Sequence, residues 1–211
     1  MKKFLIITLI CVLGIFNVAN SQVKDNAVKV NLFGAIVSQY QLSYERAFGE
    51  KFTAQLSLGY IDRTWEITVT GWDGNYEIGP RGLIIIPEGR YYFSEGMKGA
   101  YVGAFFRYRG VNQMVIDNIV DLDIDGNDID WSLQRKKTSI GGGLVFGYQI
   151  LISEAMVIDI FIGPQYKSLS VGNWAFDNSS YDIDDVPFIL SDKGEKDGVG
   201  VRFGVNFGVA F

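Results

Sequence analysis

The thirteen residues from Val199 to Phe211 read V-G-V-R-F-G-V-N-F-G-V-A-F, and this stretch decides the fold. Every odd position is Val or Phe, whereas the even positions are Gly, Arg, Asn or Ala. Only a β-strand turns such period-2 alternation into two chemically different faces. The polar face carries glycines in place of a row of Lys and Glu. This pattern favours a crowded interior on the polar side and an apolar exterior.

Seven earlier segments show the same alternation, and together with the last they predict eight strands. The expected strands are residues Val28–Val37, Tyr40–Phe48, Phe52–Tyr60, Leu83–Phe93, Tyr101–Arg109, Ile140–Ile150, Met156–Lys167 and Val199–Phe211. Each has about the 9–11 residues that a tilted strand needs to cross a bilayer. An even count of eight is the smallest usual one for single-chain bacterial barrels. The predicted fold class is therefore all-β, an eight-stranded antiparallel up-and-down transmembrane β-barrel.

The lengths of the connections give independent support for a barrel. Short links are expected at Gly49–Lys51, Ser94–Lys98 and Ser153–Glu154, and long ones over about residues 62–81, 112–138 and 170–197. Only the first link, around Ser38-Gln39, is short on the side of the long loops. Outer-membrane barrels have short periplasmic turns and long extracellular loops. Both termini are then expected in the periplasm.

The first 21 residues have the pattern of a secretory signal peptide. Lys2 and Lys3 precede an apolar run from Phe4 to Phe16, and Ala19-Asn20-Ser21 is a small-x-small cleavage site. We expect the barrel domain to comprise residues 22–211. A membrane anchor is the alternative, but the apolar run is shorter than the roughly 20 residues that a spanning helix needs. Cys11 follows Ile10 and not the small residue of a lipobox, so the mature chain is expected to lack cysteine.

The mature chain as a whole resembles the small outer-membrane barrels of the OmpX and OmpA membrane-domain type. The runs L-S-Y-E-R-A-F (Leu42–Phe48) and E-G-R-Y-Y-F (Glu88–Phe93) further resemble an uncharacterised exported-barrel family of Gram-negative bacteria. That family has no established activity. The resemblance implies the cell outer membrane as the location. It also implies that the aromatic Phe211 is part of the signal read by the outer-membrane assembly machinery.

Charged side chains are expected inside the barrel. The interior of an eight-stranded barrel is only just wide enough for side chains, and an unpaired buried charge is costly. We therefore predict an ion-pair network in which Glu45, Glu88 and Asp159 pair with Arg90, Arg107 and Arg202. Lys29, Arg109, Lys167 and several amides are also expected to face inward. The alternative is a gated pore or a proton path.

Composition argues against an enzyme and against a nucleic-acid partner. The 211-residue chain has no histidine, which barrel-type phospholipases, proteases and acyltransferases use as a base or orienting group. Its net charge of −5 disfavours binding to nucleic acid. No pair of carboxylates is singled out by spacing for hydrolysis. We expect no catalytic residues and no cofactor.

The predicted long loops are acidic and contain tryptophan. Asp121-x-Asp123-x-Asp125-Gly126 matches the first half of a calcium-binding loop, but Ser132 stands where the closing Glu would be. A solvated acidic loop is the first interpretation, and weak calcium binding or calcium bridging to lipopolysaccharide is the second. The tryptophans are expected to anchor the strand ends or to mark a contact surface; they are Trp65, Trp72, Trp131 and Trp174.

The sequence therefore supports two functional hypotheses. The first is a structural or interaction role in adhesion, envelope stability or an envelope complex. The partners would be outer-membrane lipid and lipopolysaccharide, the assembly machinery and another envelope protein. The second is a small-solute pore or a ligand-binding or transport barrel.

Aromatic residues near strand ends, Tyr60 and Tyr101 among them, are expected in girdles at the headgroup level.

Overall fold

The computed structural model describes the chain over residues 24–36, 38–63, 65–68, 75–94, 96–117, 121–122, 128–129, 132–152, 155–176 and 197–211. The predicted signal peptide lies outside these residues. Among the described residues, no helix has the length and apolar character needed to cross a membrane. The single described helix, α2 (Leu32–Ile36), is five residues long.

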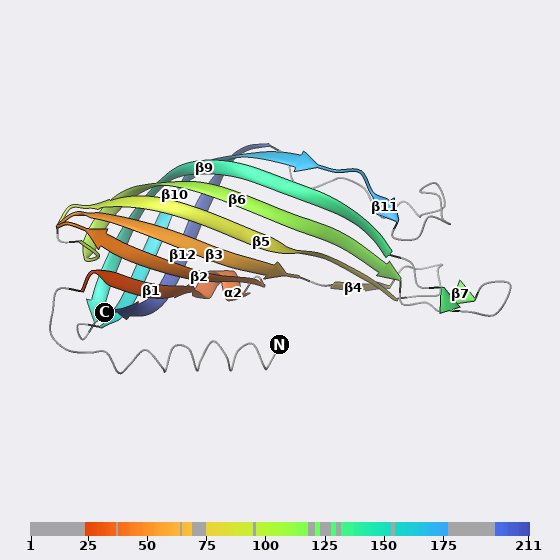
Figure 1. Ribbon diagram of the computed structural model, residues 1–211, viewed down its shortest axis with the longest axis horizontal. Coiled ribbons are helices and arrows are strands. Elements are labelled where there is room, and N and C mark those ends of the chain that lie inside the picture. The colour runs from red at the N-terminus through yellow and green to blue at the C-terminus, as the bar shows by residue number, and fades with distance from the viewer. Residues whose placement is uncertain are drawn as a thin grey trace.

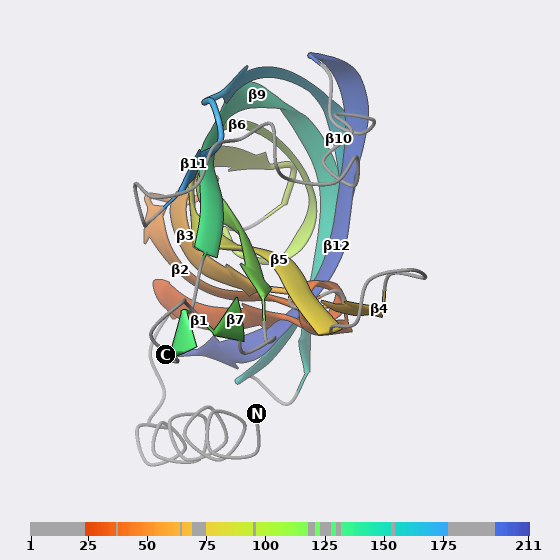
Figure 2. The ribbon, with the colours of Figure 1, turned by 90° about the vertical axis from the view of Figure 1, so that its right-hand side faces the viewer.

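Eight of the described strands form one closed antiparallel ring, which confirms the predicted barrel (Figures 1 and 2). They are β1 (Asn26–Asn31), β2 (Gln39–Phe48), β3 (Phe52–Asp62), β5 (Asn75–Tyr92), β6 (Gly99–Asp117), β9 (Ser132–Ile152), β10 (Met156–Val171) and β12 (Gly198–Ala210). Neighbours in the chain are neighbours in the ring, and β12 closes it by pairing with β1. Four short strands lie beyond the ring at the loop end, namely β4 (Trp65–Thr68), β7 (Asp121–Leu122), β8 (Asp128–Ile129) and β11 (Ala175–Phe176).

The strand register defines the stagger of the barrel. A row of paired residues that starts at Ala210 passes through Ala27, Glu45, Gln55, Glu88, Phe105, Gly143 and Gln165. It returns to β12 at Gly200, ten residues from its start. A stagger of this kind requires strands tilted by about 35–45° from the barrel axis. Residues of one row therefore lie at increasing heights, from the turn end to the loop end.

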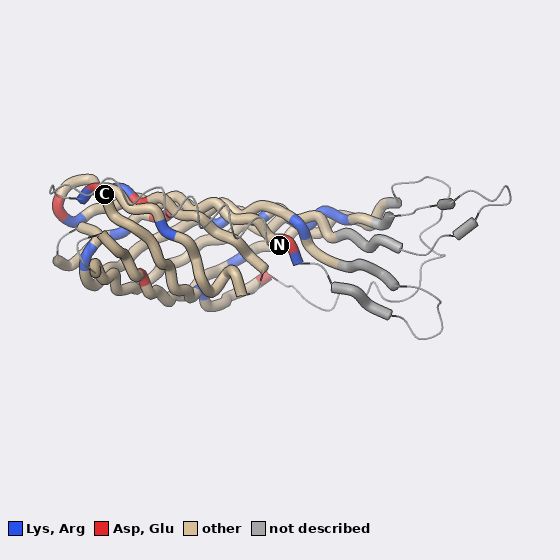
Figure 3. Tube along the Cα trace, turned by 90° about the horizontal axis from the view of Figure 1, so that it is seen from below, with Lys and Arg blue, Asp and Glu red and all other residues tan. Residues whose placement is uncertain are grey.

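The alternation of β12 has the predicted orientation. Val201 and Phe203 expose 62% and 57% of their surface, whereas Arg202 and Asn206 are buried inside. The same outward apolar pattern continues on the other strands, for example at Leu58, Leu83 and Phe146. Charged positions are sparse along the barrel strands (Figure 3). The exterior is thus an apolar band, and the polar side chains of the strands are turned inward.

The first predicted strand was too long. β1 ends at Asn31, and Leu32–Ile36 form α2, so the first link is a helical turn and not a two-residue connection. The Asn31 side chain accepts a hydrogen bond from the Gly34 backbone N–H at 2.5 Å, which satisfies one of the free donors at the helix start. Leu32, Gly34 and Ile36 follow the period-2 pattern of a strand although they lie in a helix, so the pattern predicted the wrong structure for them.

The predicted long links were also wrong in extent, because several strands continue into them. β5 begins at Asn75, β6 ends at Asp117 and β9 begins at Ser132. In the parts of the strands that extend into the predicted links, outward positions are polar, as at Arg81, Asn112 and Lys136. Pairing persists there while the apolar alternation disappears, so the pattern alone ended the strands too early.

Close contact between β9 and β10 should make one glycine sensitive to substitution. A Cβ added at Gly163 would collide with the backbone carbonyl of Leu144. We expect Gly163→Ala to lower the free energy of unfolding by about 1–3 kcal/mol. Gly89→Ala is the matched control, since a Cβ there would meet nothing within 4 Å. Urea unfolding of the refolded barrel measures both, and equal destabilisation would contradict the close approach.

Candidate functional site in the barrel interior

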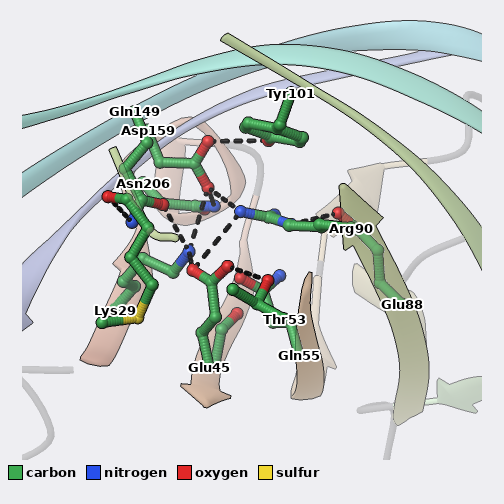
Figure 4. Close-up of polar contacts among 12 residues, drawn as sticks. Lys29, Glu45, Thr53, Gln55, Glu88, Arg90, Tyr101, Gln149, Asp159 and Asn206 are labelled. Atoms are coloured by element: carbon green, nitrogen blue, oxygen red, sulfur yellow. Dashed lines mark hydrogen bonds and ion pairs between the residues drawn. The ribbon is translucent and has the colours of Figure 1, made fainter. Parts of the chain in front are cut away.

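Four strands bring charged side chains together inside the turn half of the barrel. Lys29 comes from β1, Glu45 from β2, Arg90 from β5 and Asp159 from β10. Each exposes 2% of its surface or less. Figure 4 shows these side chains converging from opposite walls. We call the set formed by these four residues with Glu88 and Arg202 the ion-pair layer.

Lys29 is one of the three cations in this layer. Its Nζ donates to Glu45 Oε2 at 2.5 Å, to Gln149 Oε1 at 3.0 Å and to Asp159 Oδ2 at 3.2 Å. An ammonium group has three donors, so these three acceptors saturate it. The prediction placed Lys29 inside but assigned it no carboxylate partner.

Arg90 links three carboxylates, one from its own strand and two from β2 and β10. Its Nε donates to Glu88 Oε1 at 2.7 Å, and its Nη1 donates to Asp159 Oδ2 at 3.0 Å. The same Nη1 lies 3.5 Å from Glu45 Oε2. The guanidinium also stacks on the Tyr101 ring, 4.4 Å from its centroid. A planar group with several donors is suited to bridging carboxylates in this way.

Asp159 accepts hydrogen bonds from four side chains. Besides Lys29 and Arg90, the Tyr101 hydroxyl donates to its Oδ1 at 2.7 Å and Asn206 Nδ2 donates to its Oδ2 at 3.0 Å. Tyr101 is buried, so its predicted place in an aromatic girdle was wrong. It lies on the inward side of β6 because Asp159 offers its hydroxyl a partner in a position otherwise closed to water.

Both carboxylate oxygens of Glu45 and of Glu88 also accept hydrogen bonds. Thr53 Oγ1 and the Tyr92 hydroxyl donate to Glu45 Oε1 at 2.5 and 2.9 Å. Arg202 Nη1 donates to Glu88 Oε2 at 2.6 Å. The layer thus holds three carboxylates and three cations, so its formal charge is balanced.

Aromatic rings cover the loop side of the layer. The Arg202 guanidinium lies between Phe105 and Phe161, 4.3 and 4.7 Å from the two ring centroids. Phe105 and Phe161 are themselves buried. The charges below are therefore separated from the loop half by a stacked cation and two rings.

A small apolar cluster covers the turn side. It consists of Ala27, Met97, Val157 and Ala210, all buried. Met97 lies in the link between β5 and β6 with a positive φ of 61°, and its carbonyl accepts a hydrogen bond from Gln149 Nε2 at 2.8 Å. The link is therefore folded inward over the barrel end.

The loop half of the interior differs in charge and in accessibility. Arg107, Arg109, Lys137 and Lys167 occupy inward positions there, and all four are half-buried. Arg107 lies two residues beyond Phe105 toward the loops, and it takes part in other interactions. Its predicted pairing with a carboxylate of the layer stays a prediction.

The candidate calcium site falls mostly outside the described residues. Asp121 lies in β7, whereas Asp123 and Asp125 are not described. Within the described part of the chain, no group of three His, Cys, Asp or Glu side chains could hold a metal ion. Of the loop tryptophans, the Trp174 ring lies on the Arg135 guanidinium, 4.4 Å from its centroid, where it anchors the end of β9.

Comparison with known families assigns the chain to a group without a known role. A family model described as a protein of unknown function, DUF3575, matches residues 5–207. The chain belongs to the DUF3575 family. The match includes every residue of the ion-pair layer. The finer resemblance to the OmpX and OmpA type stays a prediction.

No curated protein matches this DUF3575 chain. The crystal structure of CarO from Acinetobacter baumannii is similar at 14% sequence identity and a TM-score of 0.44, over 92% of this chain and 99% of CarO. A similarity of this degree carries no inference about function.

Removing one charge from the layer should be far more harmful than removing a surface charge. We expect Asp159→Asn to lower the free energy of unfolding by about 3–5 kcal/mol, because Lys29 and Arg90 would lose a buried counter-ion. Asp62→Asn is the matched control. Asp62 pairs with Arg81 at 3.1 Å on the exposed side, and about 0–1 kcal/mol is expected there. Urea unfolding compares the two, and similar losses would contradict a tightly coupled layer.

Proposed function

We propose that the protein is a non-enzymatic outer-membrane barrel with a closed interior, which serves a structural or interaction role through its loop end. Adhesion, envelope stability and membership of an envelope complex are the roles of this kind. The expected signal peptide would deliver the chain to the envelope. Outer-membrane lipid, lipopolysaccharide and the assembly machinery would be its partners there.

The exterior supports a location in a bilayer. Leu42, Leu58, Leu144 and Ile162 each expose more than half of their surface on the outward side of different strands. Water would disfavour such a continuous apolar band, whereas hydrocarbon would accept it. Closure of the ring by β1 and β12 also pairs the backbone groups of the first strand with those of the last, as a spanning sheet requires.

The single observation that carries the closed interior is the buried, charge-balanced ion-pair layer. Lys29, Glu45 and Asp159 have side chains with no exposed surface, as does Arg90. Apolar residues cover one side of the layer and stacked rings cover the other. An aqueous path through this region would have to separate ion pairs at 2.5–3.2 Å. With no histidine in the chain, these carboxylates serve better as structural anions than as catalytic groups.

One observation favours a ligand-binding barrel as the second candidate. Solvent reaches the inward positions of the loop half, where Arg107, Arg109 and Lys167 are half-buried. A barrel that is closed at the turn end and open toward the loops can bind a ligand without conducting. The two candidates are therefore compatible with one closed layer.

Electrical measurement tests the closed interior. We expect the refolded protein in a planar lipid bilayer to show no steady open channel, because the ion pairs and stacked rings leave no continuous water path. Insertion has to be verified on the same sample by protease protection of the barrel in liposomes. A sustained ohmic conductance from inserted protein would contradict the proposal.

Assembly in cells tests the proposed location and the role of Phe211. Its backbone N–H donates to the Asn26 carbonyl at 2.8 Å and its carbonyl accepts from Asn26 N–H at 3.1 Å, contacts that Phe211→Ala retains. We expect this variant to refold normally in detergent but to reach the outer membrane less in cells. Phe93→Ala, another exposed Phe at the turn end, is the control. Wild-type yields of Phe211→Ala in the outer-membrane fraction would contradict the assembly role.

A further inference from the structure

The wall of the barrel lacks a strand along part of β12. β12 pairs with β10 from Gly198 to Val209, but with β1 only from Asn206 to Ala210. β1 ends at Asn31, opposite Asn206. Within the described part of the chain, residues 198–205 therefore have a strand on one side only. We call this open side the β12 edge.

The β12 edge lies within the apolar band. Val201 and Phe203 are largely exposed, and their partners in β10 are Pro164 and Ile162. Ile162 is also largely exposed on the outward face. Backbone N–H and C=O groups left open to hydrocarbon are strongly disfavoured, so such an edge needs a cover.

Helix α2 supplies part of that cover. It contacts both β12 and β2, and Figure 1 shows it next to the end of β1. The Phe33 ring meets the Phe203 ring edge-on at 5.2 Å between centroids. Asn31 fixes the helix start, because it accepts from the Gly34 N–H and donates to Asn206 Oδ1 at 2.9 Å. The space between β12 and β2, about 10 Å for two strand spacings, matches the width of one helix.

This cover has little stability of its own. α2 has five residues including a glycine, whereas isolated helices shorter than about 12–15 residues are marginal even with good helix formers. Leu32 and Ile36 expose 49% and 78% of their surface. The position of α2 thus depends mainly on the Asn31 hydrogen bonds and the Phe33–Phe203 contact.

The inward positions behind α2 carry basic side chains and glycines. The inward positions of β12 at this level include Gly198 and Gly200, which carry no side chain. Gly198 pairs with Lys167 of β10, and Arg109 points inward from β6. Both cations are half-buried and make other contacts, which hold them in the interior.

We propose that α2 covers a lateral entrance for a long-chain fatty acid. The acyl chain would lie along Phe33, Val201 and Phe203, and the carboxylate would turn inward to Lys167 and Arg109. An apolar edge one strand from a basic interior fits a single-chain anionic amphiphile, since each part of the ligand meets its complement. The inference rests on the proposed position of the barrel in a bilayer.

Photolabelling tests the binding site. The probe is palmitic acid with a diazirine near the chain end, added to the full-length mature barrel in liposomes. We expect adducts on α2 and on residues 198–205. We expect Lys167→Gln to lower the probe's affinity about tenfold, the effect of one charge-assisted hydrogen bond. Lys136→Gln, an exposed cation on the outward side of β9, is the matched control and should leave labelling unchanged.

Locking α2 tests the entrance. Residues 22–211 contain no cysteine, so Phe33→Cys with Phe203→Cys can be joined by a short bismaleimide without side reactions. We expect the joined form to lose most of its labelling. Phe48→Cys with Phe52→Cys, paired at the turn end, is the control cross-link and should label normally. Phe33→Ala loosens the cover without a cross-link, and faster labelling is expected.

The inference would be overturned by adducts spread evenly over the apolar exterior, by equal labelling with a neutral hexadecanol probe, or by labelling that the lock does not change. Competition by a two-chain anionic phospholipid, and not by palmitate, would overturn the single-chain ligand. Protease protection of the same liposomes shows separately whether the barrel has inserted, so a failure of the proposed function is distinguishable.

Discussion

The narrow interior of an eight-stranded ring is the constraint on which the rest of this structure depends. Side chains from opposite walls must meet at the axis, because the ring is only just wide enough to contain them. A charge placed inward in the turn half therefore loses its hydration, and it needs a counter-ion in reach. Lys29 and Asp159, from β1 and β10, meet at 3.2 Å for this reason. The same crowding requires Gly163 to be a glycine, since β9 and β10 approach closely.

Much of the fold follows from alternation, but the partners inside the barrel do not. Period 2 says which side chains turn inward, and it correctly placed Glu45, Arg90 and Arg202 there. Which inward residues meet depends on height, and height depends on the stagger of ten residues around the ring, which no local pattern contains. The stagger places Arg107 in the loop half and brings Lys29 and the buried Tyr101 to Asp159.

The errors in strand length have two separate physical origins. At β1 a side chain decided the outcome, since Asn31 favours a helical turn over continued pairing although Leu32 and Ile36 keep the strand pattern. At β5 and β6 the environment decided it. Where the outward residues are as polar as Arg81 and Asn112, the outward and inward faces of the strands no longer differ in polarity. The strands continue there through backbone pairing. Sequence patterns detect strands with one apolar and one polar face better than strands whose two faces are both polar.

The two ends of the barrel differ in charge balance and in burial. At the turn end, the layer around Arg90 is balanced in charge and buried, so a solute would have to break several buried contacts there. At the loop end, half-buried cations such as Lys167 lie behind a wall whose cover is a single helical turn. A weakly held cover is tolerable because the pairing of β1 with residues Asn206 to Ala210 of β12 closes the ring without α2. A closed barrel and an adjustable wall are thus compatible in one chain, and the ligand recognition that we propose would take place in the loop half.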